Sequence, residues 1–228
     1  MAIGYNSTNI STIKYVSNEI NTVTYNGAIV FEKLVDYTFP NTEVFMISDT
    51  KTHLPDDPEA ENCMRTRYSY RYSPTYSAYK AFDNDLTTYY KCYQGTDGTT
   101  SKEASISIVF PFPIRIQSIK IINAQLATAY GLKIGTIYIS PEAATSNFYK
   151  SGQGGTTTVY EYATVDRSDG ANTSAYSTEH INDDYKSTDI RSICVYGDKW
   201  AHSYTKIIGE VQIMFKAKSA DLAAAGLL

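Results

Sequence analysis

The chain has 228 residues, of which 43% are hydrophobic and 19% charged, so it can bury a core and is not a disordered chain. Lys and Arg number 20 and Asp and Glu 24, and the net charge of −4 gives no electrostatic reason to expect nucleic acid as a partner. The 21 tyrosines, against a single Trp, favour strands and a contact-making surface.

The cysteines and the N-terminus limit the compartment. Cys63, Cys92 and Cys194 form no CxxC pair, so neither zinc nor a redox motif is supported, and we expect reduced thiols with one disulfide as the alternative. No apolar run reaches the length of a membrane span. Residues 1–10 lack the charged and apolar regions of a signal peptide. We therefore expect synthesis and retention in a cytoplasm, or export only within a larger assembly.

Residues 11–30 contain a ten-residue repeat, STIKYVSNEI followed by NTVTYNGAIV. Apolar and polar residues alternate in each copy, which predicts short strands, and Asn26-Gly27 predicts a hairpin turn because both positions accept positive φ. Strands of this length bury too little to be stable alone. We therefore assign residues 1–34 to an assembly or docking segment, with a plain extension of the main sheet as the alternative.

From residue 35 to 216 strand signals recur at short intervals. Ile106, Ile108 and Phe110 alternate with polar or smaller residues, and the two prolines that follow, at 111 and 113, predict a break in the run. The alternation resumes at Ile114 and slips by one residue at 117–118, which predicts a β-bulge or a strong twist. Further strands are expected at 132–140, 158–165, 190–196 and 207–215. With almost no helical periodicity, this pattern predicts an all-β sandwich or barrel.

Residues 217–228 differ from the rest because they are rich in Ala and Leu. These residues favour helix, so we expect either a short docking helix or a frayed end.

The run RTRYSYRYSPTY at 65–76 alternates tyrosine with arginine. One interpretation is a platform of rings with arginine donors that suits sugars or other polar ligands. The other, which we favour, is an edge strand whose tyrosines pack on the sandwich with their hydroxyls in water.

Residues 80–90, KAFDNDLTTYY, place two aspartates at alternate positions, with a threonine hydroxyl three residues after the second. Asp83 and Asp85 repel each other unless a cation or several donors lie between them. An oxygen-rich turn of this kind suits a hard cation such as calcium, whereas a solvated turn rich in Asp and Asn is the plain alternative.

Residues 77–215 resemble the discoidin-like domains, also called coagulation-factor C-type domains, and the related galactose-binding carbohydrate-binding modules. The motif of that family is Ala-Phe/Ile-Asp-Gly-Asp-x-x-Thr-x-Trp, and residues 81–90 match it as AFDNDLTTYY, with Asn84 for Gly and Tyr90 for Trp. A strand pair at 105–122 and a final strand GEVQI at 209–213 follow in the family's order. The resemblance implies an antiparallel jelly-roll β-sandwich, here with a short N-terminal β-hairpin extension.

In family members that bind calcium, the acidic loop and the last strand form the site together. Carried over residue by residue, the resemblance implies a structural calcium held by oxygens of Lys80, Asp83, Asp85, Thr88, Gly209 and Glu210. Of these, Glu210 is a lone carboxylate beside apolar residues, which requires a positive partner. Asn84 should be tolerated because Asn accepts the left-handed conformation, and Tyr90 should fill the core beneath the loop.

Ligand recognition in such modules involves loops at one end of the sandwich and combines aromatic rings with polar side chains. The sequence offers two sets of candidates, which are Arg67, Tyr70 and Arg71 before the acidic loop and Trp200, His202 and Tyr204 before the last strand.

Residues 1–34 resemble, more weakly, the N-termini of phage tail, fibre and head-decoration proteins, whose strings of the type Ile-x-Lys-x-Tyr and Val-x-Tyr-Asn-Gly are similar to Ile13-Lys14-Tyr15 and Val23-x-Tyr25-Asn-Gly here. Together the two resemblances imply a non-enzymatic virion protein, assembled in the bacterial cytoplasm, that carries a calcium-stabilised module for glycan or host-surface contact. Its partners would be virion proteins or copies of itself, bound through 1–34, with 217–228 as a second candidate segment, and without nucleic acid or membrane insertion. The alternative is a purely structural capsid or tail module that recognises protein.

An enzyme is the third class, and the residues argue against it. His53, His180 and His202 have no Ser, Cys or metal-ligand spacing around them, so no oriented base is suggested. Asp83 and Asp85 suit a cation better than they suit an acid/base pair.

Overall fold

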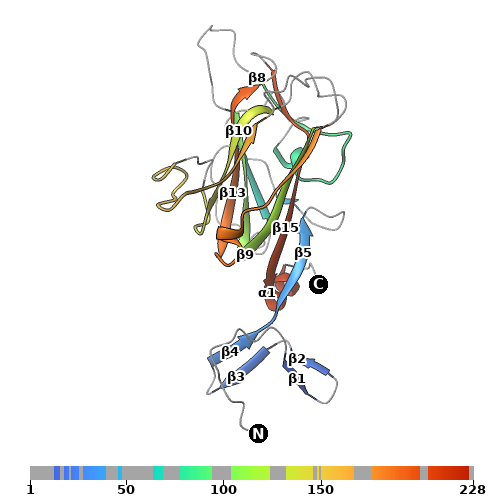
Figure 1. Cartoon of the computed structure of the whole chain (residues 1–228), viewed down its shortest axis with the longest axis vertical. Helices are drawn as coiled ribbons and strands as arrows, with labels where there is room; N and C mark the ends of the chain where they lie inside the picture. Colours follow the sequence, from blue (N-terminus) through green and yellow to red (C-terminus); the bar gives the residue numbers. More distant parts are fainter. Residues whose placement is uncertain are drawn as a thin grey trace.

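In the computed structural model the chain forms an antiparallel β-sandwich, which confirms the predicted fold class (Figure 1). The structure describes residues 13–15, 18–20, 22–25, 28–39, 46–47, 64–68, 78–93, 104–123, 132–145, 148, 150–166, 176–200 and 205–225. Within that part, no helix is long and apolar enough to cross a membrane.

Two sets of strands share one long strand, β9 (Ala104–Asn123). The first set is ordered β6 (Met46–Ile47), β7 (Met64–Tyr68), the N-terminal half of β9, β13 (Ile190–Trp200), β10 (Leu132–Ser140) and β11 (Tyr160–Asp166). The second is ordered β12 (Tyr176–His180), the C-terminal half of β9, β15 (Glu210–Lys218) and β5 (Leu34–Phe39). A separate pair joins β8 (Tyr90–Tyr93) to β14 (Thr205–Ile208).

The two prolines of β9 do not end the strand, as the sequence had predicted, but mark where it changes partners. Val109 and Ile114 both pair with β13, at Ser192 and Ile190, with an irregular register across the prolines between them, and Arg115 then pairs with Lys216 of β15. Proline has no N–H to donate to a ladder, which accounts for the irregular register just before the backbone joins the other set of strands. The predicted break is therefore wrong for the strand, which continues, but the pairing of the strand is interrupted at the prolines.

The bulge predicted at 117–118 is confirmed. Met214 pairs with Ser118 while the next residue, Phe215, pairs with Ile116, so Gln117 is left over in the β9–β15 ladder. The extra residue restores the alternation, because Ile116 and Ile119 are both fully buried on either side of it.

The core lies between the two sets of strands and consists mainly of isoleucine and phenylalanine. Its fully buried members include Phe82, Tyr90, Ile106, Ile108, Phe110, Ile114, Ile116, Ile119, Ile121, Ile213 and Phe215. A smaller cluster on the opposite face of β9 and β13 consists of Val109, Ala144, Phe148 and Cys194. Burial raises the pKa of the Cys194 thiol to about 12, so this cysteine stays protonated and unreactive.

The N-terminal repeat forms two hairpins, one per copy. β1 (Ile13–Tyr15) pairs with β2 (Asn18–Ile20), and β3 (Thr22–Tyr25) pairs with β4 (Ala28–Glu32). Tyr25 faces Ala28 across the predicted Asn-Gly turn, so the hairpin is confirmed. Among the described ladders neither hairpin pairs with the sandwich, and Figure 1 shows both beyond the lower end of β5.

Two elements differ from the predicted ones. The strand expected at 207–215 is two strands, β14 and β15, separated at Gly209. The polar sequence YSTEH predicts a loop, whereas it forms β12, an edge strand on β9.

The short C-terminal helix, one of the two predicted outcomes, is confirmed as α1 (Ser219–Ala224), whose Leu222 is fully buried in the core. Since Lys218 pairs with Leu34, α1 begins beside the point where the hairpins lead into β5.

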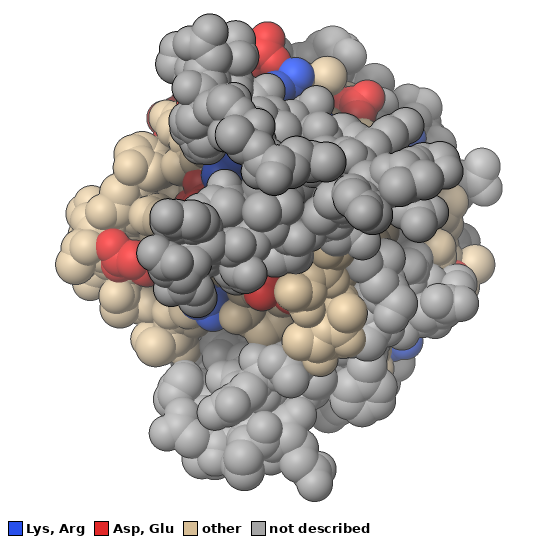
Figure 2. Space-filling model, turned by 90° about the horizontal axis from the view of Figure 1, so that it is seen from below, with Lys and Arg blue, Asp and Glu red and all other residues tan. Residues whose placement is uncertain are grey.

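Figure 2 views the molecule from the hairpin end, where acidic and basic side chains of the described residues are interspersed without a large patch of one sign.

The docking of α1 can be tested with Leu222→Ala, which should lower the free energy of unfolding by about 2–4 kcal/mol because a buried leucine is removed. Denaturant unfolding followed by tyrosine fluorescence measures this. The control is Met214→Ala on the exposed face of β15, where 44% of the residue is already in solvent and the loss should stay below about 1 kcal/mol. Equal losses in the two variants would contradict the docked helix.

Candidate cation site

The acidic loop is fixed at both of its ends by buried residues. It begins in the short 3₁₀ helix η3 (Ala78–Ala81), whose two alanines are fully buried, and continues into buried Phe82. It ends at Tyr90, which is also fully buried and fills the core beneath the loop, as predicted. Between them Asn84 has φ of 56°, the left-handed conformation that Asn accepts at little cost, as expected.

Strand register brings Glu210 to this loop. Tyr90 of β8 pairs with Ile208 of β14 in an antiparallel ladder. Thr88, two residues before Tyr90, and Glu210, two residues after Ile208, therefore leave the ladder on the same side. Gly209, between the two strands, is buried.

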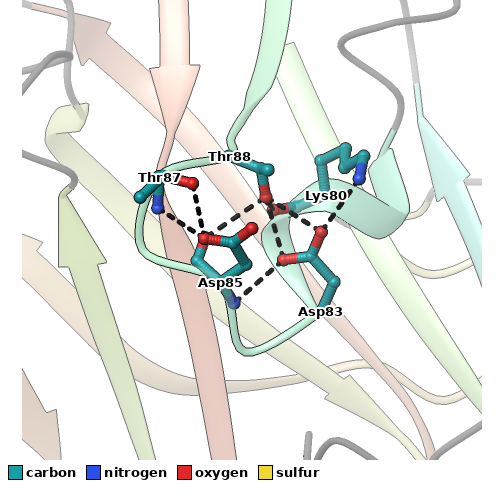
Figure 3. Close-up of polar contacts among 5 residues, drawn as sticks. All are labelled: Lys80, Asp83, Asp85, Thr87 and Thr88. Atoms are coloured by element: carbon teal, nitrogen blue, oxygen red, sulfur yellow. Dashed lines mark hydrogen bonds and ion pairs between the residues drawn. The ribbon is translucent and has the colours of Figure 1, made fainter.

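Four acceptor oxygens surround the hydroxyl of Thr88 (Figure 3). Thr88 Oγ1 lies 2.9 and 3.0 Å from the two carboxylate oxygens of Asp83, 3.2 Å from the carbonyl oxygen of Asp85 and 3.4 Å from that of Lys80. A hydroxyl carries one proton and can satisfy only part of this set. Acceptor oxygens therefore gather here in excess of the one proton between them, and such an arrangement favours a cation.

The carboxylates of Asp83 and Asp85 differ in their contacts. Asp83 Oδ2 forms an ion pair with Lys80 Nζ at 3.3 Å, and its Oδ1 accepts from the backbone N–H of Asp85 at 3.2 Å. Asp85 Oδ1 accepts from the hydroxyl and the backbone N–H of Thr87 at 2.6 and 2.9 Å, and these hydrogen bonds lower its pKa. Asp85 therefore faces Thr88 with its carbonyl, while Oδ1 of its side chain is bound to Thr87.

Glu210 is fully buried, and neither of its carboxylate oxygens makes a hydrogen bond. Burial raises the pKa of Glu210 to about 8, and the negative charges of Asp83 and then Asp85 add to the rise. The backbone N–H groups of Asn84 and Asp83 approach closely enough to lower this pKa in part, although they lack hydrogen-bond geometry. Such a carboxylate is costly unless a cation accompanies it.

The donor set suits calcium better than a transition metal. Within the described residues no three Asp, Glu, His or Cys side chains converge as a metal-binding group, so a cation here would combine two carboxylates, Asp83 and Glu210, with carbonyl and hydroxyl oxygens. Calcium takes six to eight oxygens of these kinds, whereas zinc prefers nitrogen and sulfur.

Two contacts of the loop were not expected from the sequence. Gln212 Nε2 donates to Asn84 Oδ1 at 3.3 Å, which joins β15 to the tip of the loop. The ammonium of Lys80 contacts Asp83 directly, whereas the sequence predicts only an oxygen of Lys80 as a ligand of the cation. The Lys-x-x-Asp spacing could have indicated the ion pair, since residues three apart in a helical turn are neighbours.

The candidate ligand-binding residues are only partly within the described chain. Arg67 lies on β7 and Trp200 ends β13, and only their backbone is described. Tyr70, Arg71, His202 and Tyr204 lie outside the described residues. Their role in binding stays a prediction.

Strand register nevertheless places the ends of β7 and β13 together. Arg67 pairs with Ser107 of β9, and Gly197 pairs with Ala104 at the start of the same strand. β7 and β13 therefore finish at the same end of the sandwich. That end also carries β8, away from the hairpins (Figure 1).

Comparison with known proteins finds similar folds at low identity. No family model matches the chain, and no curated protein does. Among solved structures, the family 32 carbohydrate-binding module of Clostridium perfringens NanJ with galactose is 13% identical, with 69% of this chain and 96% of that chain covered at a TM-score of 0.49. Chitosan-binding module 1 of a Paenibacillus chitosanase/glucanase is 16% identical, with 65% and 92% covered at 0.46.

An F5/8 type C domain from Bacteroides fragilis is 11% identical, with 69% and 93% covered at a TM-score of 0.45. Similarity at this level establishes no shared family or activity, so the proposals below rest on this chain's own residues.

The unpaired charge of Glu210 can be tested with Glu210→Gln. Without calcium, at pH 8, the free energy of unfolding of the variant should be about 1–2 kcal/mol higher than that of the natural chain, because a buried unpaired charge is removed. With calcium the order should reverse, because the variant loses a charged ligand. Chemical denaturation with EDTA and with calcium measures both states.

A matched control is Glu142→Gln. The Glu142 carboxylate accepts three hydrogen bonds from Thr157 and Thr158, far along the chain from the acidic loop. Glu142→Gln should change the free energy of unfolding by the same amount with and without calcium. A Glu210→Gln variant that behaves in the same calcium-independent way would contradict a cation at this site.

Proposed function

We propose that the chain is a non-enzymatic binding module whose sandwich is stabilised by calcium. The observation that carries the proposal is Glu210, a fully buried carboxylate without a hydrogen bond that faces the oxygen-rich loop at Asp83. A calcium ion at this point would pair with Glu210 and Asp83 and would accept lone pairs from the carbonyls of Lys80 and Asp85. It would thereby join the loop to the last strand.

The role of this cation would be structural. The hydroxyl of Thr88 and the carboxylate of Asp83 are partly buried, and the loop is joined at both ends to the core residues Phe82 and Tyr90. A cation that holds the loop to these core residues would stabilise the fold, and recognition would belong to the surrounding loops.

We further propose that the ligand is a glycan bound at the end of the sandwich where β7 and β13 finish. Support comes from the resemblance of residues 77–215 to discoidin-like and galactose-binding modules, and from the register that brings Arg67 and Trp200 to one end. Rings with polar donors beside them suit sugars, whose two faces are apolar and whose edges are hydroxyls.

The N-terminal hairpins would attach the module to a phage particle. Support comes from their resemblance to phage structural proteins and from their position at the end opposite β8 (Figure 1). Assembly would then occur in the bacterial cytoplasm, with virion proteins or copies of the chain as partners.

A purely structural decoration or cement module is the second candidate. It is favoured by one observation, namely that the described hairpin strands pair with each other and not with the sandwich, so their edges are open to another protein.

Hydrolysis has little support among the described residues. His180 is half-buried at the end of β12 with its Nε2 unpaired, and burial lowers its pKa. The backbone carbonyl of His180 accepts a hydrogen bond from the Tyr162 hydroxyl at 3.4 Å.

Calcium should stabilise the chain measurably. At a calcium concentration about a hundredfold above the dissociation constant, stabilisation of about 2.7 kcal/mol is expected, which corresponds to a rise in Tm of roughly 5–10 °C for a chain of this size. Differential scanning calorimetry in EDTA, calcium and magnesium measures this. Magnesium should act more weakly because it prefers a smaller octahedral site. Identical Tm values in EDTA and calcium would overturn the cation proposal.

The glycan proposal is tested on a glycan array with calcium present. Weak binding is expected and should be lost in Trp200→Ala, because a ring that stacks on the sugar is removed. Tyr185→Ala, in the short 3₁₀ helix η5 (Asp183–Tyr185) that precedes β13, is the control and should bind as the natural chain does. Absence of binding at millimolar sugar would favour the structural candidate.

A further inference from the structure

Lys80 contributes two groups to the candidate cation site. Its carbonyl oxygen lies 3.4 Å from the hydroxyl of Thr88, within the oxygen cluster. Its ammonium turns back and lies 3.3 Å from Asp83 Oδ2, as Figure 3 shows. The same residue therefore offers the site both a ligand for a cation and a positive charge of its own.

The ammonium is held by two neighbours. Besides the ion pair with Asp83, Lys80 Nζ lies 4.8 Å from the centre of the Tyr79 ring, a distance suited to a cation–π contact. Burial opposes the charge, but the hydrogen bond and the charge of Asp83 outweigh it, and the net pKa of Lys80 is raised. Lys80 is therefore charged when it contacts the loop.

We propose that Lys80 is a built-in counter-ion which occupies the carboxylate of Asp83 until calcium replaces it. The inference rests on the proposed cation site. Lys80 would keep the loop folded when calcium is absent and would weaken calcium binding, because its ammonium must leave Asp83 before the ion can use both carboxylate oxygens.

The exchange is physically reasonable for this side chain. The Lys80 side chain is 26% exposed, so it is not enclosed by the protein, and its stem is flexible. The single charge of Lys80 is bound to Asp83, whereas Glu210 still lacks a hydrogen bond. A divalent ion can neutralise both carboxylates, including that of Glu210, which the lysine does not pair with.

The test compares Lys80→Met with a matched control, Lys186→Met. Lys186 forms an ion pair with Asp183 at the same spacing of three residues, at 2.6 Å and outside the acidic loop. Calcium affinity is measured by isothermal titration calorimetry, and Tm is measured in EDTA. Lys80→Arg retains the charge and should behave nearly as the natural chain.

Removal of the lysine charge should have two opposite effects. Calcium should bind Lys80→Met about twofold to fivefold more tightly, the range expected when a partly exposed ion pair no longer competes. In EDTA its Tm should fall further than that of Lys186→Met. Folding of Lys80→Met only when calcium is present would also support the proposal.

Failure of this proposal is distinguishable from failure of the cation site. If the natural chain binds calcium and Lys80→Met binds it equally or more weakly, the counter-ion role is overturned and the site stands. If neither protein binds calcium, both proposals are overturned. Folding of Lys80→Met in neither condition would likewise overturn the counter-ion role, because calcium should then replace the lost charge.

Discussion

The buried carboxylate of Glu210 is the constraint on which this account depends. It stands at the start of the last long strand, fully buried, without a hydrogen bond and opposite the acidic loop. An ionised carboxylate in such surroundings costs several kcal/mol unless a cation is supplied. The oxygens around Thr88 need the same partner, so one ion at this point would resolve both features.

The fold explains how residues more than a hundred positions apart come to share this site. β8 and β14 form a short ladder outside the two main sets of strands, and that ladder fixes the acidic loop beside the start of β15. β9 carries the sandwich around the site by leaving one set of strands at its prolines and joining the other. A cation that joins the loop to β15 would therefore act on the closure of the sandwich itself.

Much of the site follows from local chemistry and was predictable. Asp83, Asn84 and Asp85 favour a tight turn by their own side chains, and Tyr90 ends it as a core residue. The bulge at Gln117 followed from a slip in alternation that only an extra residue can absorb.

What the sequence did not predict depends on tertiary contacts. β12 is polar and becomes a strand only because the edge of β9 offers it a ladder. The prolines of β9 predict the end of a strand, yet β9 continues through them. Sequence alone does not show that a second set of strands is available for pairing after the prolines. The ammonium of Lys80 and the bound state of Asp85 depend on how the turn closes, which composition does not specify.

The most direct measurement is a crystal structure of the chain grown with calcium. The account predicts an ion bound by Asp83 and Glu210 together with the carbonyls of Lys80 and Asp85, at about 2.3–2.6 Å, with the Lys80 ammonium displaced from Asp83. A loop without an ion, in which Glu210 has a protein hydrogen-bond partner and Lys80 still contacts Asp83, would contradict it.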